Sequence, residues 1–271
     1  MAKSEMSTNR ATSKGVLRAK ANQGMFTIAR HLPANDLEPF VQHYWIARWD
    51  LRDRPPYITE TLPYPGVNLV FEPNQSRIFG IFTGKSDKTL QGKSQACAIL
   101  FRPGGFDPFL KSPIAEFTDS SLDLAATFGS NIIEIEQRLL ASDDDASMIE
   151  TVEEFLRRRE PQQDSQLRLI RAIIDWIIDD RTITKVKQVC DRFESSERTL
   201  QEIFHTYVGI GVKWVIMRYR LQDAVQRIST GETIDWVGLA LDLGYTDQPH
   251  FIKDFKKIIG QTPANYRRAE T

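Results

Sequence analysis

Polar side chains cluster on one face of an expected helix near residue 200. Arg198, Gln201 and Glu202 follow one another at the helical spacing i, i+3, i+4, so they share a face. In the major groove of DNA, arginine can donate to guanine O6 and N7, glutamine can pair with adenine, and glutamate can accept from cytosine N4. These residue types favour contact with bases or phosphates, and a solvated helix face is the alternative interpretation.

A second set of such side chains follows further along the chain. Gln248, His250 and Lys253 supply polar groups, whereas Pro249 and Ile252 could contact thymine methyl groups. The candidate nucleic-acid interface therefore lies on two short helices and consists of Arg198, Gln201, Glu202, Gln248, Pro249, His250 and Lys253.

The elements that must position the second set are typical of a helix-turn-helix. Gly244 can end the first helix, because glycine enters the left-handed conformation without a steric penalty. Thr246 or Asp247 can cap the second helix, and Pro249 is tolerated in its first turn. The expected apolar face of the second helix consists of Phe251, Phe255, Ile258 and Ile259. The expected apolar positions of the first helix are Ile234, Val237, Ala240 and Leu241.

The same pattern occurs once already in the chain. Leu200 precedes Phe251 by 51 residues (251 − 200). The same offset relates Phe204 to Phe255 and Gly209 to Gly260. Ser196 is the expected N-cap of the earlier helix, and an amphipathic helix from about residue 214 to 228 joins the two copies. The repeat predicts two helix-turn-helix units in tandem.

Residues 167–268 resemble the C-terminal DNA-binding domain of the AraC/XylS family of bacterial transcription regulators. The motifs that carry the resemblance are Ser196-x3-Leu200-x2-Ile203-Phe204-x4-Gly209, Arg220-Leu221-x2-Ala224, Ala240-x3-Gly244-Tyr245, Asp247-Gln248, His250-Phe251-x3-Phe255-Lys256-x3-Gly260 and Thr262-Pro263-Ala264-Asn265-Tyr266-Arg267. The resemblance implies double-stranded DNA as the partner, RNA polymerase as a further partner if the protein is an activator, and recognition helices in successive major grooves.

Two positions depart from the family pattern. Glu194 stands where the family's turn usually has glycine, and Glu202 stands where a basic or polar base-reading residue is common. By resemblance, Arg220 ties the central helix to its neighbours rather than reading bases. The resemblance therefore fixes the type of domain more firmly than the DNA sequence that it reads.

The charge of the chain is unevenly distributed. Residues 165–271 hold 16 Lys and Arg against 14 Asp and Glu, a net charge of +2, whereas residues 26–164 hold 14 against 21, a net charge of −7. A mildly basic C-terminal region predicts modest non-specific DNA affinity, which argues against a histone-like architectural protein.

Residues 26–118 are expected to be mainly β. Apolar side chains alternate over residues 41–49, and further short apolar runs at 67–71, 77–82 and 97–101 are separated by Gly and Pro turns. This pattern favours a sandwich or barrel. The region is similar to the cupin-like or jelly-roll N-terminal domains that many AraC-type regulators use for small-molecule effectors.

Aromatic side chains and one arginine of this region are candidates for an effector site. Arg102, flanked by aromatic residues, could meet a carboxylate or stack on a planar ligand, or it could pair with Glu60 or Glu72. Aromatic side chains on strands more often belong to the core. The candidate effector-binding residues are Arg102, Trp45, Trp49, Phe71 and Phe106.

Two amphipathic helices are expected within residues 119–160, with apolar stripes over 132–140 and 149–156. The resemblance implies a dimerisation or interdomain role for them. We expect the two stripes, which include Leu139 and Phe155, to pack together and to form part of a homodimer contact. The alternative is that they only cap the β domain.

The predicted fold class is α+β multidomain: an N-terminal β-barrel or jelly-roll-like domain followed by helices, then a C-terminal all-α domain with two helix-turn-helix motifs. The expected organisation is a disordered tail (1–25), a cupin-like β effector-binding domain (26–118), a helical dimerisation or interdomain region (119–160), a linker (161–166) and an AraC-type DNA-binding domain (167–271).

Four scattered histidines and the lack of phosphate-loop or hydrolase motifs predict no catalytic residue, no metal site and no cofactor. No signal-peptide core or membrane-length apolar run is found, and only two cysteines occur, so a bacterial cytoplasmic, nucleoid-associated protein without membrane contact is expected. Two alternatives stay open: a cupin-like enzyme fused to a helical module, and a constitutive DNA binder with a purely structural β domain.

Overall fold

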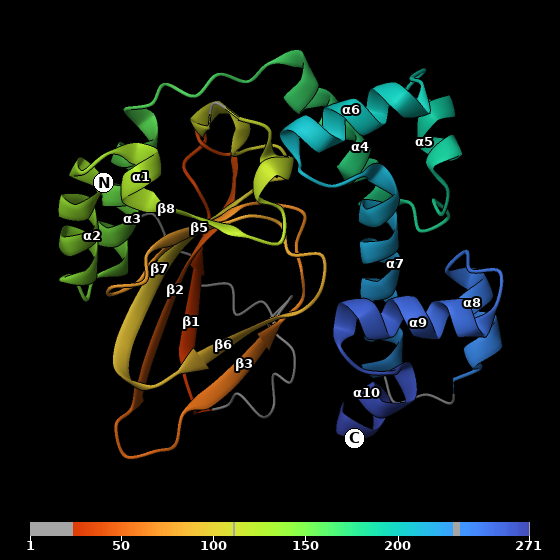
Figure 1. Cartoon of the computed structure of the whole chain (residues 1–271), viewed down its shortest axis with the longest axis horizontal. Coiled ribbons are helices and arrows are strands. Elements are labelled where there is room, and N and C mark those ends of the chain that lie inside the picture. Colours follow the sequence, from red (N-terminus) through yellow and green to blue (C-terminus); the bar gives the residue numbers. More distant parts are fainter. Residues whose placement is uncertain (1–23, 111, 230–233, 271) are drawn as a thin grey trace, which may run out of the picture.

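The computed structural model describes residues 24–110, 112–229 and 234–270 (Figure 1). Its N-terminal half contains two antiparallel sheets, one of six strands in the order β1-β2-β7-β4-β5-β8 and one of two strands, β3-β6. The strands of the large sheet are β1 (Thr27–His31), β2 (Val41–Leu51), β4 (Asn68–Phe71), β5 (Arg77–Phe79), β7 (Gly92–Phe101) and β8 (Ser121–Asp123). The small sheet consists of β3 (Tyr57–Thr61) and β6 (Ser86–Leu90).

Short helices follow β7, and two of them, α2 and α3, pack against the large sheet. They are the 3-10 helices η1 (Asp107–Phe109) and η2 (Ile114–Phe117), and the α-helices α1 (Leu124–Phe128), α2 (Asn131–Leu140) and α3 (Asp145–Arg157). Arg48 of β2 pairs with Asp145 of α3 at 2.7 Å, and Gln95 of β7 donates to the Leu140 carbonyl at 2.9 Å. These contacts fix α2 and α3 against the two longest strands.

The C-terminal half is entirely helical. It consists of α4 (Ser165–Asp179), α5 (Val186–Arg192), α6 (Glu197–Tyr207), α7 (Val212–Ser229), α8 (Trp236–Asp242), α9 (Gln248–Ile259) and α10 (Pro263–Glu270). Helix α7 runs between two groups of helices, with α5 and α6 at one end and α8 and α9 at the other (Figure 1). This arrangement of a β-rich half and a helical half with two helix-turn-helix motifs confirms the predicted fold class.

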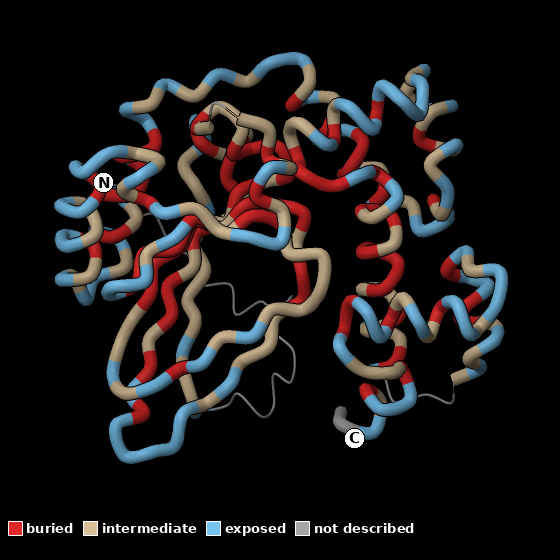
Figure 2. Tube along the Cα trace, in the orientation of Figure 1, coloured by how far each residue is buried: buried red, intermediate tan, exposed pale blue. Residues whose placement is uncertain are grey.

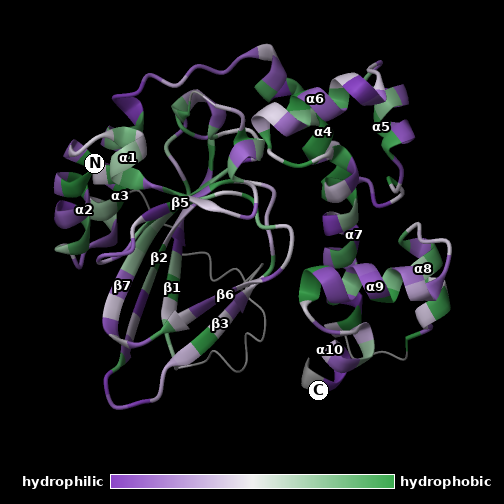
Figure 3. Cartoon of the chain, in the orientation of Figure 1, coloured by the Kyte–Doolittle hydropathy of each residue, from purple (hydrophilic) through white to green (hydrophobic). Residues whose placement is uncertain are grey.

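The hydrophobic core is not divided at the boundary between the two halves. One continuous cluster runs from Leu37 in the β domain to Tyr219 in α7, and it includes the buried faces of α4 and α6. A separate cluster lies among α7, α8, α9 and α10, and Leu62 is its contribution from the β domain. Figures 2 and 3 show the buried, apolar positions as stripes on the inner faces of these helices.

Three expectations concerned the N-terminal tail, the linker between the two halves and the absence of a membrane span. The tail over residues 1–25 lies outside the described residues except for Gly24 and Met25. Residues 160–164 carry no helix, and α4 begins at Ser165. Among the helices that the structure describes, none combines the length and the apolar character needed to cross a membrane.

Candidate nucleic-acid interface

The first helix-turn-helix unit consists of α5, a short turn and α6. Ser196 caps α6, as predicted, because its hydroxyl accepts a hydrogen bond from the Thr199 N–H at 3.0 Å. Leu200 and Phe204 are fully buried, as their correspondence to the apolar-face residues Phe251 and Phe255 in the repeat leads one to expect. The opposite face of α6 is therefore left to solvent.

Three predicted interface residues lie on that exposed face of α6. The side chains of Arg198, Gln201 and Glu202 are all exposed, and Arg198 donates from Nε to Glu202 Oε1 at 2.9 Å. His205 continues the same face one turn later. Among the described residues, the Arg198–Glu202 ion pair is the one found on this face, which presents its donors and acceptors to solvent.

The second unit consists of α8, a turn and α9. Asp247 rather than Thr246 is the N-cap, because its carboxylate accepts from the His250 N–H at 2.8 Å. The predicted apolar face of α9 is buried throughout; it comprises Phe251, Phe255, Ile258 and Ile259. On the other side Pro249, His250 and Lys253 are exposed, whereas Gln248 is half-buried.

Ile252 has a different environment from the one expected of a thymine contact. It is half-buried and packs against the second core. The accessible face of α9 is extended instead by Lys256 and Lys257, which are exposed in its last turn. Lys256 follows Lys253 by three residues, so helical spacing alone places both on one face, although Lys256 was not among the candidate interface residues.

The turns of the two units use the left-handed conformation at different residue types. Glu194 has φ +48° and Gly244 has φ +82°. Each turn closes in the same way: the Ser195 N–H donates to the Cys190 carbonyl, and the Tyr245 N–H donates to the Ala240 carbonyl. The glutamate that replaces the family's glycine therefore adopts the glycine-like conformation, which costs an L-residue about 1–2 kcal/mol.

Helix α7 holds both units, and a buried arginine fixes it to α4. Arg220 is almost fully buried, donates to the Ile177 carbonyl and pairs with Asp223 at 3.2 Å. Burial lowers the pKa of its guanidinium, and the nearby Asp223 carboxylate opposes that shift. The predicted structural role of Arg220 is confirmed.

The apolar pattern of α8 was only partly interpreted correctly from the sequence. Val237 and Leu241 are 54% and 58% exposed, so they do not belong to the core as expected. Ala240 is buried as expected, and Leu239 and Leu243 are buried in place of Val237 and Leu241. The error arose because α8 is only seven residues long and two adjacent apolar stripes fit its sequence equally well.

The five candidate effector residues are not brought together. Trp45 and Trp49 lie in one cluster of the β domain, whereas Phe71 and Phe106 belong to the continuous core. Successive side chains of a strand point to opposite faces of a sheet, so aromatic residues that are close in sequence can serve different layers. Phe71 and Phe106 are packed against other phenylalanine rings.

Arg102 lies at the boundary between the β domain and α4. Its Nη2 donates to Glu38 Oε1 at 2.5 Å and its Nε donates to the Glu38 carbonyl at 2.8 Å. Arg171 of α4 donates to both carboxylate oxygens of Glu38 at 2.8 Å. Hydrogen bonds from Arg171, and then the charge of Arg102, lower the pKa of the Glu38 carboxyl. The expected alternative partners are engaged elsewhere: Glu60 pairs with Lys85, and Glu72 pairs with Lys88.

This bridge from Glu38 to Arg171 was missed by sequence reasoning. The two residues are 133 positions apart, so no local pattern could have indicated it. A small pocket of about 30 Å³ adjoins the bridge and includes Arg102 and Arg171 in its lining. It has room for roughly one water molecule.

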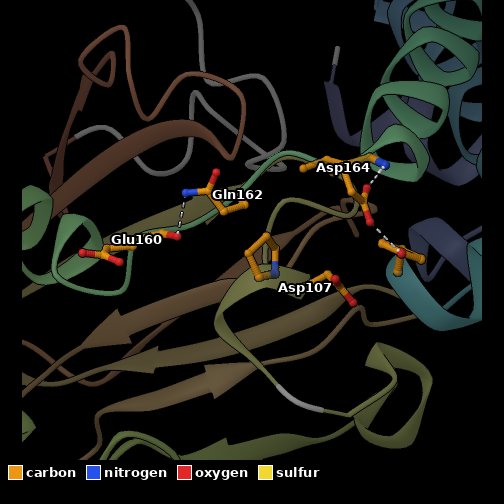
Figure 4. Close-up of a pocket in the computed structure, with 7 residues that line it drawn as sticks. Asp107, Glu160, Gln162 and Asp164 are labelled. Carbon is orange, nitrogen blue, oxygen red and sulfur yellow. Dashed lines mark hydrogen bonds between the residues drawn. The ribbon is translucent and has the colours of Figure 1, made fainter.

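A larger pocket of about 240 Å³ lies where the β domain, the segment before α4 and α6 meet (Figure 4). Asp164 accepts hydrogen bonds there from the Leu167 N–H and the Tyr207 hydroxyl, both at 2.8 Å. Burial, and then the charge of Asp164, raises the pKa of Asp107 to about 6. Neither Asp107 nor this pocket was among the predicted sites.

The two helical stripes of residues 132–156 are satisfied mainly within the chain. Leu139 and Phe155 are fully or almost fully buried in the continuous core, so neither can be a dimer contact as expected. They are buried because α2 and α3 lie directly on the large sheet. Ile133 is the apolar side chain of α2 that is exposed.

Comparison with known proteins adds family information to this geometry. A model of a helix-turn-helix domain matches residues 189–269, and a model of a domain of unknown function, DUF6597, matches residues 29–123. The raffinose operon transcriptional regulatory protein RafR of Pediococcus pentosaceus is 30% identical over 84 residues. That similarity covers 31% of this chain and 30% of RafR, so the chain matches less than a third of its relative's length.

Two solved structures are among those to which the chain is similar. ToxT of Vibrio cholerae is 12% identical, with a TM-score of 0.39 over 90% of this chain and 98% of ToxT. The C-terminal domain of AraT, a response regulator of Geobacillus stearothermophilus, is 22% identical, with a TM-score of 0.34 over 37% of this chain and 84% of that domain.

Three findings agree on the type of domain in the C-terminal half. The quoted motifs span the C-terminal half, the structure contains the tandem units joined by α7, and the helix-turn-helix model matches across both units. The C-terminal half of the chain is therefore a tandem helix-turn-helix domain similar to those of AraC-type regulators.

Proposed function

We propose that this protein is a sequence-specific, DNA-binding transcription regulator. The observation that carries the proposal is the pair of capped helices, α6 and α9, each with a buried aromatic face and an exposed polar face. Interface residues on the two helices are Arg198, Gln201, Glu202, Gln248, Pro249, His250 and Lys253.

The length of α7 supports a bipartite mode of binding. Its 18 residues correspond to about 27 Å of helix. Half-sites that lie on one face of DNA are about 34 Å apart, one helical turn. Two recognition helices at the ends of α7 are therefore suited to successive major grooves.

The test is selection of binding sites from randomised duplexes by the full chain. We expect enrichment of a site with two parts about one helical turn apart. Lys253→Ala should weaken binding to the selected site by about 1–3 kcal/mol if Lys253 reads a base. Arg158→Ala, an exposed change at the C-cap of α3 in the β half, is the matched control. Failure of the full chain to enrich any sequence would refute the proposal.

We also propose that a small-molecule effector controls this activity through the β domain. Support comes from two contacts of that domain with the helical half: Glu38 binds Arg171 of α4, and Leu62 packs in the core of the second unit. The pocket beside Asp107 and Tyr207 is a space in which a ligand would touch the β domain and α6 together. The residues first expected to bind the effector do not form one site, so each is a candidate only by itself. They are Arg102, Trp45, Trp49, Phe71 and Phe106.

A thermal-shift screen tests effector control. A ligand should raise the melting temperature by mass action and should also change the affinity for the selected DNA site. If a ligand raises the melting temperature while the affinity for DNA stays constant, the proposal that an effector controls DNA binding is contradicted.

For assembly we propose a homodimer that uses the exposed part of α2, and for an activator a contact with RNA polymerase. Ile133 supports the first part, because it is the exposed apolar side chain of α2. Light scattering of the unmodified chain should then give a dimer, and Ile133→Glu a monomer. A monomeric unmodified chain at micromolar concentration would rule out the dimer.

A further inference from the structure

The ion pair between Arg198 and Glu202 on α6 contributes little to the stability of the fold. Arg198 Nε lies 2.9 Å from Glu202 Oε1, and the two side chains are 88% and 65% exposed. Exposed pairs of this kind contribute about 0–1 kcal/mol. Here the arginine precedes the glutamate, which is the less favourable order, because the positive end of the helix dipole is at the N-terminus.

The same pair also opposes simple electrostatic attraction to DNA. Glu202 lies on the face that would meet the duplex, where its charge is repelled by phosphates. Over its full length α6 carries one basic and two acidic residues, whereas α9 carries three basic residues and one acidic residue. An acidic residue on this face therefore needs a role other than attraction.

The geometry leaves the terminal nitrogens of Arg198 available. Its Nε is held by Glu202, and among the described residues no partner is found for Nη1 or Nη2. Arg198 follows the cap Ser196 by two residues, so it belongs to the end of α6 that contacts base edges in helix-turn-helix proteins. A planar fork of two N–H donors matches O6 and N7 of guanine.

On the basis of the proposed function, we infer that Arg198 reads a guanine and that Glu202 is its positioning residue. Holding Nε keeps the guanidinium from turning to a phosphate, and it reduces the rotamer freedom that is lost on binding. Glu202 thereby lowers the affinity for DNA in general and raises the preference for guanine.

The chain offers a matched control pair. Lys187 and Asp191 have the same spacing and order on α5, with Nζ 3.0 Å from Oδ1 and side chains 81% and 63% exposed. They lie on the first helix of the same unit, which in helix-turn-helix proteins crosses the backbone rather than reading bases. Substitution there changes the charge of the unit without touching α6.

The experiment compares variants of the full chain on the site that the unmodified chain selects. Arg198→Ala should lower the preference for guanine at one position by about 10-fold or more. Arg198→Lys keeps the charge but not the fork, so it should lose most of that preference. A site in which 7-deazaguanine, which lacks N7, replaces that guanine should be bound more weakly by the unmodified chain. The same replacement should have little further effect on binding by Arg198→Ala.

The role of Glu202 predicts effects of opposite sign on two quantities. Glu202→Ala should reduce the preference for guanine, while binding to random duplex DNA becomes tighter because a negative charge is removed. Glu202→Gln keeps an acceptor for Nε, so it should retain more guanine preference than Glu202→Ala. Asp191→Ala should tighten random binding to a similar or smaller extent and leave base preference unchanged.

The outcomes separate this inference from the proposed function. If the unmodified chain selects no site, both are overturned. If it selects a site and Arg198→Ala keeps every base preference, the guanine assignment is wrong and the proposed function stands. If Arg198→Ala loses the preference for guanine and Glu202→Ala keeps it, the assignment of Glu202 as a positioning residue is wrong.

Discussion

The two helix-turn-helix units share one plan, yet their cores are enclosed differently. The core of the first unit is continuous with that of the β domain, so Phe204 belongs to the same cluster as Leu37. The core of the second unit is separate, and Leu62 is the β-domain side chain that enters it. Equal local patterns therefore produce one unit that is part of a large cooperative body and one that is nearly independent.

The recognition helices differ in charge as well. Helix α6 carries a net charge of −1 from Glu197, Arg198 and Glu202, whereas α9 carries +2 from Lys253, Asp254, Lys256 and Lys257. The second unit is therefore better suited to phosphate attraction, and the first depends more on specific hydrogen bonds. The two tandem units are therefore not interchangeable.

The largest expected loss of stability comes from truncating one buried phenylalanine to alanine in the core of each unit. Phe204→Ala and Phe255→Ala should each cost about 3–5 kcal/mol, because both rings are fully buried. Hydrogen exchange should show that Phe204→Ala lowers protection in the β domain and α4 as well as α6. Phe255→Ala should act mainly on α8, α9 and α10. Equal loss of protection in β2 and β7 for both variants would remove the distinction between the units.

The next effect isolates the contact between the β domain and the second unit. Leu62→Ala should cost about 2–3 kcal/mol, because Leu62 is buried in the second core. Ile58→Ala, an exposed change on neighbouring β3, is the control and should have little effect. Hydrogen exchange should show faster opening of α9 and not of α6. Faster opening of α6 instead would contradict the assignment of Leu62 to the second core.

Glycine and non-glycine substitutions in the two turns should have effects of opposite sign. Gly244→Ala should cost about 2 kcal/mol or more, because φ is +82° and an added Cβ would meet Thr184 Cβ at 2.4 Å. Glu194→Gly should gain about 0.5–1 kcal/mol, since relief of strain exceeds the added chain entropy. Glu194→Ala is the control and should be near neutral. Urea denaturation measures all three, and a destabilised Glu194→Gly would show that the glutamate is held by contacts instead.

The smallest effect concerns the pocket beside the first unit. The folded pKa of Asp107 is about 6, above the ordinary value of about 4, so its contribution to stability is full below pH 4 and is lost as pH rises through 6. Asp107→Asn should remove this dependence and stabilise the chain at pH 7 by about 1 kcal/mol, after discounting for solvent screening. The same change at exposed Asp53 is the control. Parallel stability–pH curves for Asp107→Asn and the unmodified chain would contradict burial of this carboxyl.

The sequence predicted the features that depend on neighbours in the chain. Ser196 and Asp247 were identifiable as caps because a cap acts on a backbone N–H three residues away. Phe251 and Phe255 were identifiable as core because the 3.6-residue period is local. The same reasoning placed Arg198 and Lys253 on exposed faces, and the structure agrees.

What the sequence did not predict depends on distant partners or on competing patterns. The contacts of Glu38 with Arg102 and Arg171 join segments 64 and 133 residues apart. The exposure of Leu241 could not be separated from the burial of Leu243, because both fit an apolar stripe in a short helix. Burial of Leu139 and Phe155 depends on a sheet whose strands precede them by tens of residues.

The single continuous helix between the two units has a consequence for how DNA sites of such a regulator can diverge. One residue added to α7 advances the second unit by 1.5 Å but turns it by about 100° around the helix axis. Seven residues, close to two full turns, would restore its direction while adding about 10 Å of length. Changes on α6 and α9 can therefore alter which bases are read, while the distance between the two halves of an operator stays fixed as long as α7 (Val212–Ser229) keeps its length.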